Sequence, residues 1–180
     1  EKGVLDDTVV IVTSDHGEGM GELNVIGDHA VADESVSRVP MIIRWPNMGR
    51  PGVGGSGRID RALHYQTDVA ATIVELAGGV VPAHWDGRSF AGALREGRDA
   101  GRDSLVVSQC CWSVMRAVRW GDYMYIHPYH TGLKDMPSRM LFNLAEDPHE
   151  LANLAESQPA LAKKVIEAIT DGRRRNRYLR

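Results

Sequence analysis

The sequence predicts an α/β fold followed by a small antiparallel sheet that a C-terminal helix covers. Three observations predict it: strands of the buried type flank a loop rich in Gly and acid near the start, short strand-like segments follow one another after residue 104, and the last periodic segment is amphipathic. The chain has 180 residues, of which 43% are hydrophobic and 25% charged. This composition is typical of a folded protein with one domain or two small ones.

The first part of the chain carries two strand-like segments and a helix. Residues 7–14 (DTVVIVTS) and 39–45 (VPMIIRW) are apolar runs rich in β-branched side chains, which predicts strands buried on both faces of a parallel sheet. Residues 66–77 (QTDVAATIVELA) predict a helix that a glycine pair stops. The Gly-rich stretch 49–57 and residues 80–103 are predicted loops, and the latter marks the boundary between two units.

The second part of the chain predicts a small antiparallel sheet and its covering helix. The strand candidates are short and separated by turn residues, and they lie at 105–109, 113–120, 122–127 and 139–143. Residues 158–170 place Leu161, Val165, Ile166 and Ile169 on one helix face, which predicts a helix packed on that sheet. The arginines after residue 172 are read either as a solvated terminus or as a site for an anionic partner.

Charge and hydropathy exclude some classes of function. The net charge is −3 and the pI is near 6.2, so we expect no nucleic-acid partner. No apolar run reaches the roughly 18 residues that a membrane-spanning helix needs, and the first residues (EKGVLDDT) lack the apolar core of a signal peptide, so we expect no membrane association. No prediction of compartment or oligomeric state follows.

Two acid–imidazole pairs lie in one loop after the first predicted strand. Asp15 and His16 stand at the strand's carboxyl end, where ligands bind in open α/β sheets, and Asp28 and His29 close the same loop. A carboxylate and an imidazole can share a divalent cation, and a second imidazole could bind an anionic ester or the metal. The alternative reading is that Asp15 caps a turn and that both histidines are ordinary polar loop residues.

Several motifs in one order resemble a sulfatase of the alkaline-phosphatase superfamily. The chain reads TSDHGE at 13–18 and GDHAVADESVSRVPMIIRWP at 27–46, then QTDVAATIVELAG, DGRSF, MRAVRWGDYMYI and LFNLAEDPHELANLA. The resemblance covers about residues 5–155 and matches the C-terminal half of such an enzyme. It implies that residues 1–100 belong to the alkaline-phosphatase-like mixed sheet with flanking helices, and that residues 101–180 form a small C-terminal α+β subdomain.

The resemblance also implies roles for the loop residues. Asp15 and His16 match the pair that ligates the active-site cation, which is usually calcium; with an imidazole ligand, manganese or zinc is also compatible. His29 lies where many sulfatases carry a Lys that holds the sulfate and the leaving oxygen, which implies a catalytic and substrate-binding residue. A protonated imidazole acts so only near or below a pKa of about 6.5, unless a neighbouring acid such as Asp28 raises it.

The nucleophile of the family is not in this chain. A sulfatase nucleophile resembles Cys-x-Pro-Ser-Arg or Ser-x-Pro-x-Arg and becomes a formylglycine hydrate upstream of the segments quoted above. The segment 135–139 (DMPSR) mimics only the end of that motif, since Asp135 cannot become formylglycine. Cys110 and Cys111 lack the Pro-x-Arg context and are expected to pack at a strand end.

The sequence therefore predicts part of a metal-dependent sulfuric ester hydrolase whose substrate is a small sulfate ester or a sulfated glycan. One alternative is a phosphodiester or phosphonate monoester hydrolase of the same superfamily, because tetrahedral anionic esters make similar demands on a site. Another is a catalytically incompetent folding or interaction module. The resemblance assigns no role to the other histidines, which are His64, His84, His127, His130 and His149. It does imply that the loop 126–137, which carries His127 and His130, could edge the substrate pocket.

Overall fold

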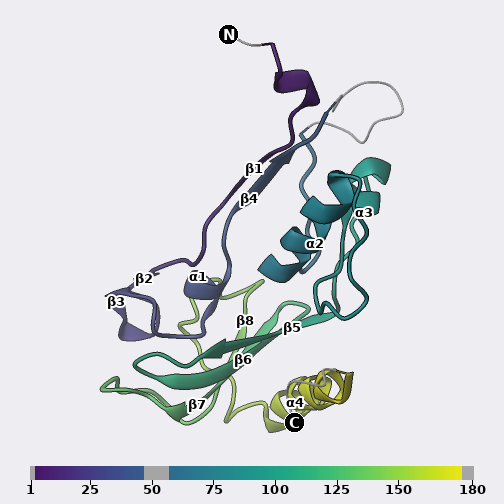
Figure 1. Cartoon of the computed structure of the whole chain (residues 1–180). Coiled ribbons are helices and arrows are strands. Elements are labelled where there is room, and N and C mark those ends of the chain that lie inside the picture. Colours follow the sequence, from purple (N-terminus) through teal and green to yellow (C-terminus); the bar gives the residue numbers. More distant parts are fainter. Residues whose placement is uncertain (1–2, 47–56, 176–180) are drawn as a thin grey trace. The chain divides into compact units, whose positions relative to one another are not determined.

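The computed structural model describes residues 3–46 and 57–175, with side chains up to residue 167 (Figure 1). Of the predicted Gly-rich stretch only Gly57 is among them, and the arginine side chains of the basic end lie outside them. The chain forms two compact units, residues 1–12 with 41–103, and residues 13–40 with 104–180. The predicted boundary after residue 100 lies close to the last of these division points, between residues 103 and 104. The assignment of residues 1–100 and 101–180 to two domains stays a prediction.

The first unit contains a two-stranded sheet and two helices. Strand β1 (Val10–Thr13) pairs with β4 (Met41–Arg44), preceded by the 3-10 turn η1 (Leu5–Asp7). Helix α2 (Gln66–Leu76) confirms the predicted helix.

Two expectations for this unit were wrong. Helix α3 (Ala91–Glu96) lies in the predicted loop; it is a short helix that ends at Gly97, whose φ of 65° is left-handed. The strands were expected to be buried on both faces, but Val12 and Ile42 are 56% and 68% exposed. Among the described residues, β1 and β4 pair only with each other, so they form a two-stranded ribbon and not the interior of a wider sheet.

A buried ion pair connects the elements of the first unit. The carboxylate of Asp68, in the first turn of α2, accepts bonds from Arg102 Nε at 2.9 Å and Nη2 at 2.5 Å. It also accepts the backbone N–H groups of Tyr65 and Arg88. Burial alone would raise the pKa of Asp68, but these bonds together hold it below its ordinary value. The pair ties the start of α2 to the segments around residues 88 and 102.

The second unit is built on the predicted antiparallel sheet of four strands. Their order is β5-β6-β7-β8, each antiparallel to the next. The strands are β5 (Ser104–Gln109), β6 (Val114–Trp120), β7 (Tyr123–His130) and β8 (Met140–Asn143). The turn between β6 and β7 has Gly121 at a φ of 54°, a left-handed conformation that glycine adopts without strain. Strand β7 extends three residues beyond the predicted segment.

Alternation along β7 explains why both faces of this sheet are covered. Tyr125 packs with Leu141 and with Val165 of α4 (Pro159–Arg175), so the predicted helix does cover one face (Figure 1). Met124 and Ile126 face the other way. Their cluster contains buried residues of β6 and β8 and of the segment before α1 (Glu34–Ser37), namely Met115, Ala117, Met140, Phe142, Val25, Val31 and Ala32.

Residues 13–40 are therefore packed on the sheet instead of forming a free loop. They contain β2 (Gly19–Met20), η2 (Glu22–Asn24), β3 (Ile26–Asp28) and α1. Val31 and Ala32 are each 1% exposed in the core on this face. The α/β fold class predicted from the sequence is confirmed, and the segment that carries the candidate site rests on the antiparallel sheet. In the described residues, no helix is both long enough and apolar enough to cross a bilayer.

Candidate active site

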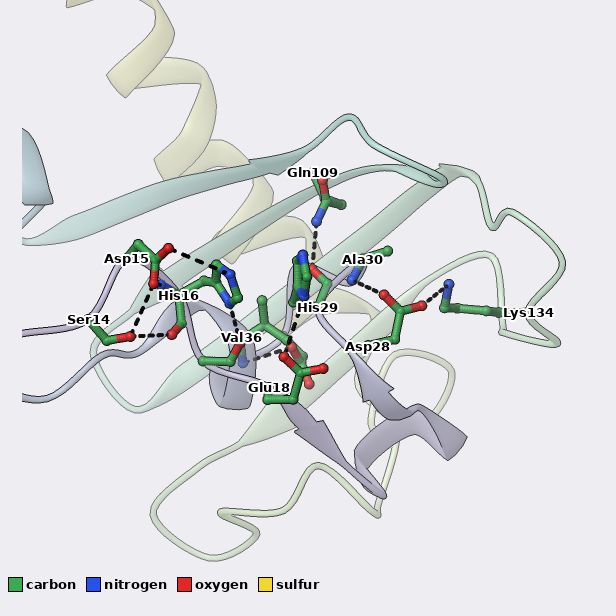
Figure 2. Close-up of polar contacts among 12 residues, drawn as sticks. Ser14, Asp15, His16, Glu18, Asp28, His29, Ala30, Val36, Gln109 and Lys134 are labelled. Atoms are coloured by element: carbon green, nitrogen blue, oxygen red, sulfur yellow. Dashed lines mark hydrogen bonds and ion pairs between the residues drawn. The ribbon is translucent and has the colours of Figure 1, made fainter.

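The turn after β1 holds Asp15 and His16 side by side (Figure 2). Asp15 Oδ2 lies 3.8 Å from His16 Nε2, and Asp15 Oδ1 accepts the backbone N–H of His16 at 3.0 Å. That backbone bond is the main reason why the pKa of Asp15 is below its ordinary value. The carboxylate is 88% exposed, so an ionised group faces solvent beside an imidazole.

Gly17 fixes this turn against helix α1. Its N–H donates to Val36 O at 2.8 Å. A Cβ at this position would lie 1.9 Å from Ser35 O, so only glycine allows so close an approach. On the other side of the turn, Ser14 Oγ donates to His16 O at 2.6 Å. The peptide unit between His16 and Gly17 is therefore held at both its oxygen and its nitrogen, by bonds that do not involve the His16 ring.

The β2–β3 hairpin places Glu18 opposite His29. Gly19 pairs with Asp28 in the antiparallel register, so the next pair outward is Glu18 with His29. Glu18 Oε2 lies 3.4 Å from His29 Nδ1. The rings of His16 and His29 stack with 4.0 Å between their centroids and 23° between their planes. The two imidazoles predicted from the sequence are thus brought together, and Glu18 joins them.

Asp28 has a different role from the one expected. It was a candidate for the acid that acts on the His29 ring, but its carboxylate contacts Lys134 Nζ at 3.0 Å and accepts Ala30 N–H at 2.9 Å. The Lys134 bond is the main cause of its lowered pKa. The acid against the His29 ring is Glu18, and sequence reasoning missed it. The hairpin register was the signal that could have found it, since Glu18 and His29 flank the paired segments.

Two side chains hold the backbone around His29, one from the last residue of β5 and one from the β5–β6 connection. Gln109 Nε2 donates to His29 O at 2.7 Å. Ser113 Oγ donates to Ala30 O at 2.6 Å, and Ser113 is 1% exposed. Because two consecutive carbonyls are fixed in this way, the position of His29 depends on residues about 80 positions later in the chain.

A second group of acids lies buried where α1 begins, and sequence reasoning did not find it either. Asp33 caps α1 by accepting Val36 N–H, and Glu150 Oε2 accepts Glu34 N–H at 3.2 Å. Glu150 is 3% exposed, and its Oε1 atom has no protein hydrogen-bond partner. Burial, and next the nearby charge of Asp33, raise the pKa of Glu150 to about 8. Burial likewise raises the pKa of Asp33.

The residues that the sequence analysis rejected as nucleophiles do not join the cluster of Asp15, His16, Glu18 and His29. Cys110 and Cys111 were expected to pack at a strand end, but both are exposed free thiols, because β5 ends at Gln109 and they lie in the turn that follows. Their backbone N–H groups both donate to Gln109 Oε1. Asp135 lies in the connection between β7 and β8.

The histidines without a matched role have other neighbours. His127 packs edge-on against Tyr129, and His130 Nδ1 accepts Gly132 N–H. His64 Nε2 lies 3.6 Å from Asp60 Oδ2, and His149 Nδ1 lies 3.3 Å from Glu22 Oε1.

The donor chemistry of the loop fits a divalent cation. Asp15 supplies an ionised, exposed carboxylate and His16 supplies an imidazole nitrogen 3.8 Å away. When His16 Nδ1 donates to Gly17 O, 2.8 Å away, Nε2 carries the lone pair and faces Asp15. Carboxylate oxygen suits calcium, whereas the imidazole favours a transition metal. The pair predicted from the sequence is therefore able to contribute two ligands.

Comparisons with known proteins agree with these features. Residues 1–80 match the family model described as Sulfatase. The multifunctional alkaline phosphatase superfamily protein PehA of Trinickia caryophylli is 32% identical, over 92% of this chain and 33% of its own length. A delta 4,5-hexuronate-2-O-sulfatase of Bacteroides thetaiotaomicron is 29% identical, over 89% of this chain and 33% of its own length. A solved 2-O GAG sulfatase is 25% identical with a TM-score of 0.75, covering 93% of this chain and 36% of that one.

The similarity extends over both units, because these alignments cover about nine tenths of the chain. The chain itself spans about a third of the length of the curated relatives that it matches. Sequence motifs, fold and relatives agree: the first 80 residues match the sulfatase family, and the chain is similar to sulfatases over most of its length.

Proposed function

We propose that this chain is part of a metal-dependent sulfuric ester hydrolase and supplies part of its cation and sulfate site. The observation that carries the proposal is the convergence of Asp15, His16 and His29 in one segment of a chain whose first 80 residues match the sulfatase family. None of the three is a nucleophile in this reading. They bind and neutralise negative charge, which is the main demand of a reaction at a tetrahedral anionic ester.

Asp15 and His16 are the proposed cation ligands. When bound, a divalent cation supplies Lewis-acid stabilisation of the charge on the ester oxygens. Asp15 is suited to the role because its lowered pKa keeps it ionised at neutral pH, and His16 because the peptide unit that follows it is fixed. Calcium is the expected ion, with manganese or zinc as the alternatives that the imidazole would favour.

His29 is the proposed anion-binding and proton-donating residue. Its ring is 54% exposed, so a substrate oxygen can reach it, and its backbone is anchored through Gln109. In the protonated form it donates a hydrogen bond to an ester oxygen or a proton to the leaving group. Glu18, 3.4 Å from Nδ1, orients the ring and stabilises its positive charge.

The nucleophile is proposed to come from sequence outside this chain, as a formylglycine formed from a Cys or Ser. The chain spans about a third of its relatives, and no formylglycine motif occurs in its 180 residues. Two protein ligands seldom hold a divalent ion tightly, so further cation ligands are proposed to come from the same source. The isolated chain is accordingly expected to be inactive and to act, at most, as a folding module.

The proposed substrate is a sulfate ester, either a small molecule or a sulfated glycan. Relatives named as an ulvan-active sulfatase and as a hexuronate-2-O-sulfatase support the glycan. A second candidate is a phosphodiester or phosphonate monoester, because the relative with 32% identity is described as a multifunctional alkaline phosphatase superfamily protein. No nucleic-acid or membrane partner is proposed.

The test is an assay of the chain extended upstream to include a formylglycine motif, with matched aryl sulfate, phosphate diester and phosphonate esters. We expect the aryl sulfate to be hydrolysed with a faster turnover than the phosphate and phosphonate esters. In buffers without added zinc, Asp15→Asn should lose both the cation and the activity, whereas His29→Ala should keep the cation and lose turnover. His84→Ala is the matched control, because this histidine is exposed and lies outside the cluster.

Three results would contradict the proposal. An extended chain that hydrolyses none of the three esters would show that the protein is not such a hydrolase. Preference for a phosphate or phosphonate ester would favour a phosphodiester or phosphonate monoester hydrolase. Equal cation loss in Asp15→Asn and His29→Ala would show that His29 is a ligand of the resident cation.

A further inference from the structure

We propose that His16, Glu18 and His29 form a binding site for a transition-metal dication of the zinc type. This set is distinct from the cation pair of the proposed function, because it leaves out Asp15 and adds Glu18 and His29. One donor atom from each of the three residues lies within 4.8 Å of the others. Two imidazole nitrogens and one carboxylate oxygen are a set that zinc binds, with an open position left for water.

The donor atoms are close to one another, but the two imidazole rings must reorient to share one ion. Two donors on a tetrahedral zinc ion are roughly 3.3 Å apart, given metal–ligand bonds of about 2.0–2.1 Å. Glu18 Oε2 and His29 Nδ1 already stand 3.4 Å apart, and one donor atom of His16 lies within 4.8 Å of both residues' donors. The rings of His16 and His29 are stacked, so one of them has to turn until the in-plane lone pairs of both point to the same ion. Rotation of exposed side chains supplies this change without moving the backbone.

The backbone under the three donors is fixed, which lowers the entropy lost on binding. Glu18 and His29 adjoin the paired residues Gly19 and Asp28 of the hairpin, and the His29 carbonyl is held by Gln109. His16 precedes Gly17, which is bonded to α1. All three residues belong to the unit that contains the antiparallel sheet, so the site is complete within this chain.

The three side chains are also open to an ion from solvent. The exposed fractions are 42% for His16, 39% for Glu18 and 54% for His29. Glu18 neutralises one of the two positive charges of a bound dication. Since His16 belongs to both sets, zinc in this site would compete with the Asp15–His16 pair and would occupy the His29 ring, so it should inhibit the proposed hydrolase. That consequence rests on the proposed function, whereas zinc binding does not.

The test is isothermal calorimetry of zinc chloride with this chain, in a buffer that does not chelate zinc. We expect one equivalent of bound zinc. Glu18→Gln and His29→Ala should each weaken binding by at least the roughly 10–100-fold that loss of an outer partner of a metal site costs. Asp15→Asn is the discriminating control and should keep the affinity of the unmodified chain. His130→Ala controls for surface histidines, and circular dichroism reports whether each variant is folded.

Zinc K-edge absorption on the loaded chain gives a second readout, with two imidazole scatterers expected. Absence of stoichiometric binding would overturn the site, and loss of affinity in Asp15→Asn would show that zinc takes the Asp15–His16 pair instead. These readouts do not use ester hydrolysis. Failure here therefore leaves the proposed hydrolase standing, and an inactive extended chain leaves the zinc site standing.

Discussion

Glu150 offers the sharpest test of the packing beneath the candidate site. Its carboxyl group is 3% exposed, accepts the N–H of Glu34 at the start of α1, and lies near the charge of Asp33. Glu150→Gln keeps the shape of the neutral carboxyl group and removes its ionisation. The variant should therefore be more stable than the parent chain at every pH at which Glu150 ionises in the unfolded chain.

The size of this stability difference follows from the raised pKa of Glu150. In the unfolded chain the group ionises near its ordinary value of 4.5, and in the folded chain near about 8. Stability from this group is fully present below pH 4.5 and is lost as the pH rises toward 8. Each pH unit in that interval costs about 1.36 kcal/mol. The interval from 4.5 to about 8 therefore removes on the order of 5 kcal/mol from the free energy of unfolding.

The assay is urea unfolding followed by circular dichroism at several pH values from 4.5 to 9. The difference in unfolding free energy between Glu150→Gln and the parent should be small at the acidic end and grow to several kcal/mol at pH 8.5. Glu146→Gln removes an exposed carboxylate from the same connection and should show no such growth. Parallel curves for Glu150→Gln and the parent would refute the assignment of a buried, neutral Glu150.

Three further substitutions test other contacts. Arg102→Met leaves Asp68 buried without its ion-pair partner and should lower the free energy of unfolding by about 3–5 kcal/mol in urea titrations. Ser113→Ala leaves the buried carbonyl of Ala30 without its donor and should cost about 1–3 kcal/mol, measured in the same way. Gly17→Ala sets a methyl group against a backbone oxygen of α1 and forces the turn away from that helix, so calorimetry should show weaker zinc binding and the melting temperature should fall.

Periodicity in the sequence predicted the antiparallel sheet well, because each strand of the sheet is covered on both faces. Along β7 the side chains of Met124, Tyr125 and Ile126 alternate between two apolar clusters, and the next strand, β8, is buried at every position except Asn143. The same method misjudged β1 and β4, because an apolar run indicates that a strand is suited to burial but not what covers it. The short helix α3 was not predicted, because its 6 residues are too few for a periodic pattern.

The sequence by itself predicted the resemblance to sulfatases and placed the candidate site residues in one loop. Asp15 and His16 are neighbours in the chain, and His29 closes the same loop. Only the tertiary structure decided that Glu18, and not Asp28, lies against His29, because hairpin register sets which side chains meet across two strands. It also decided that Glu150 is buried under α1, 116 residues from its partner Glu34. Contacts at such separations follow from how the chain packs on its sheet, which local sequence patterns do not encode.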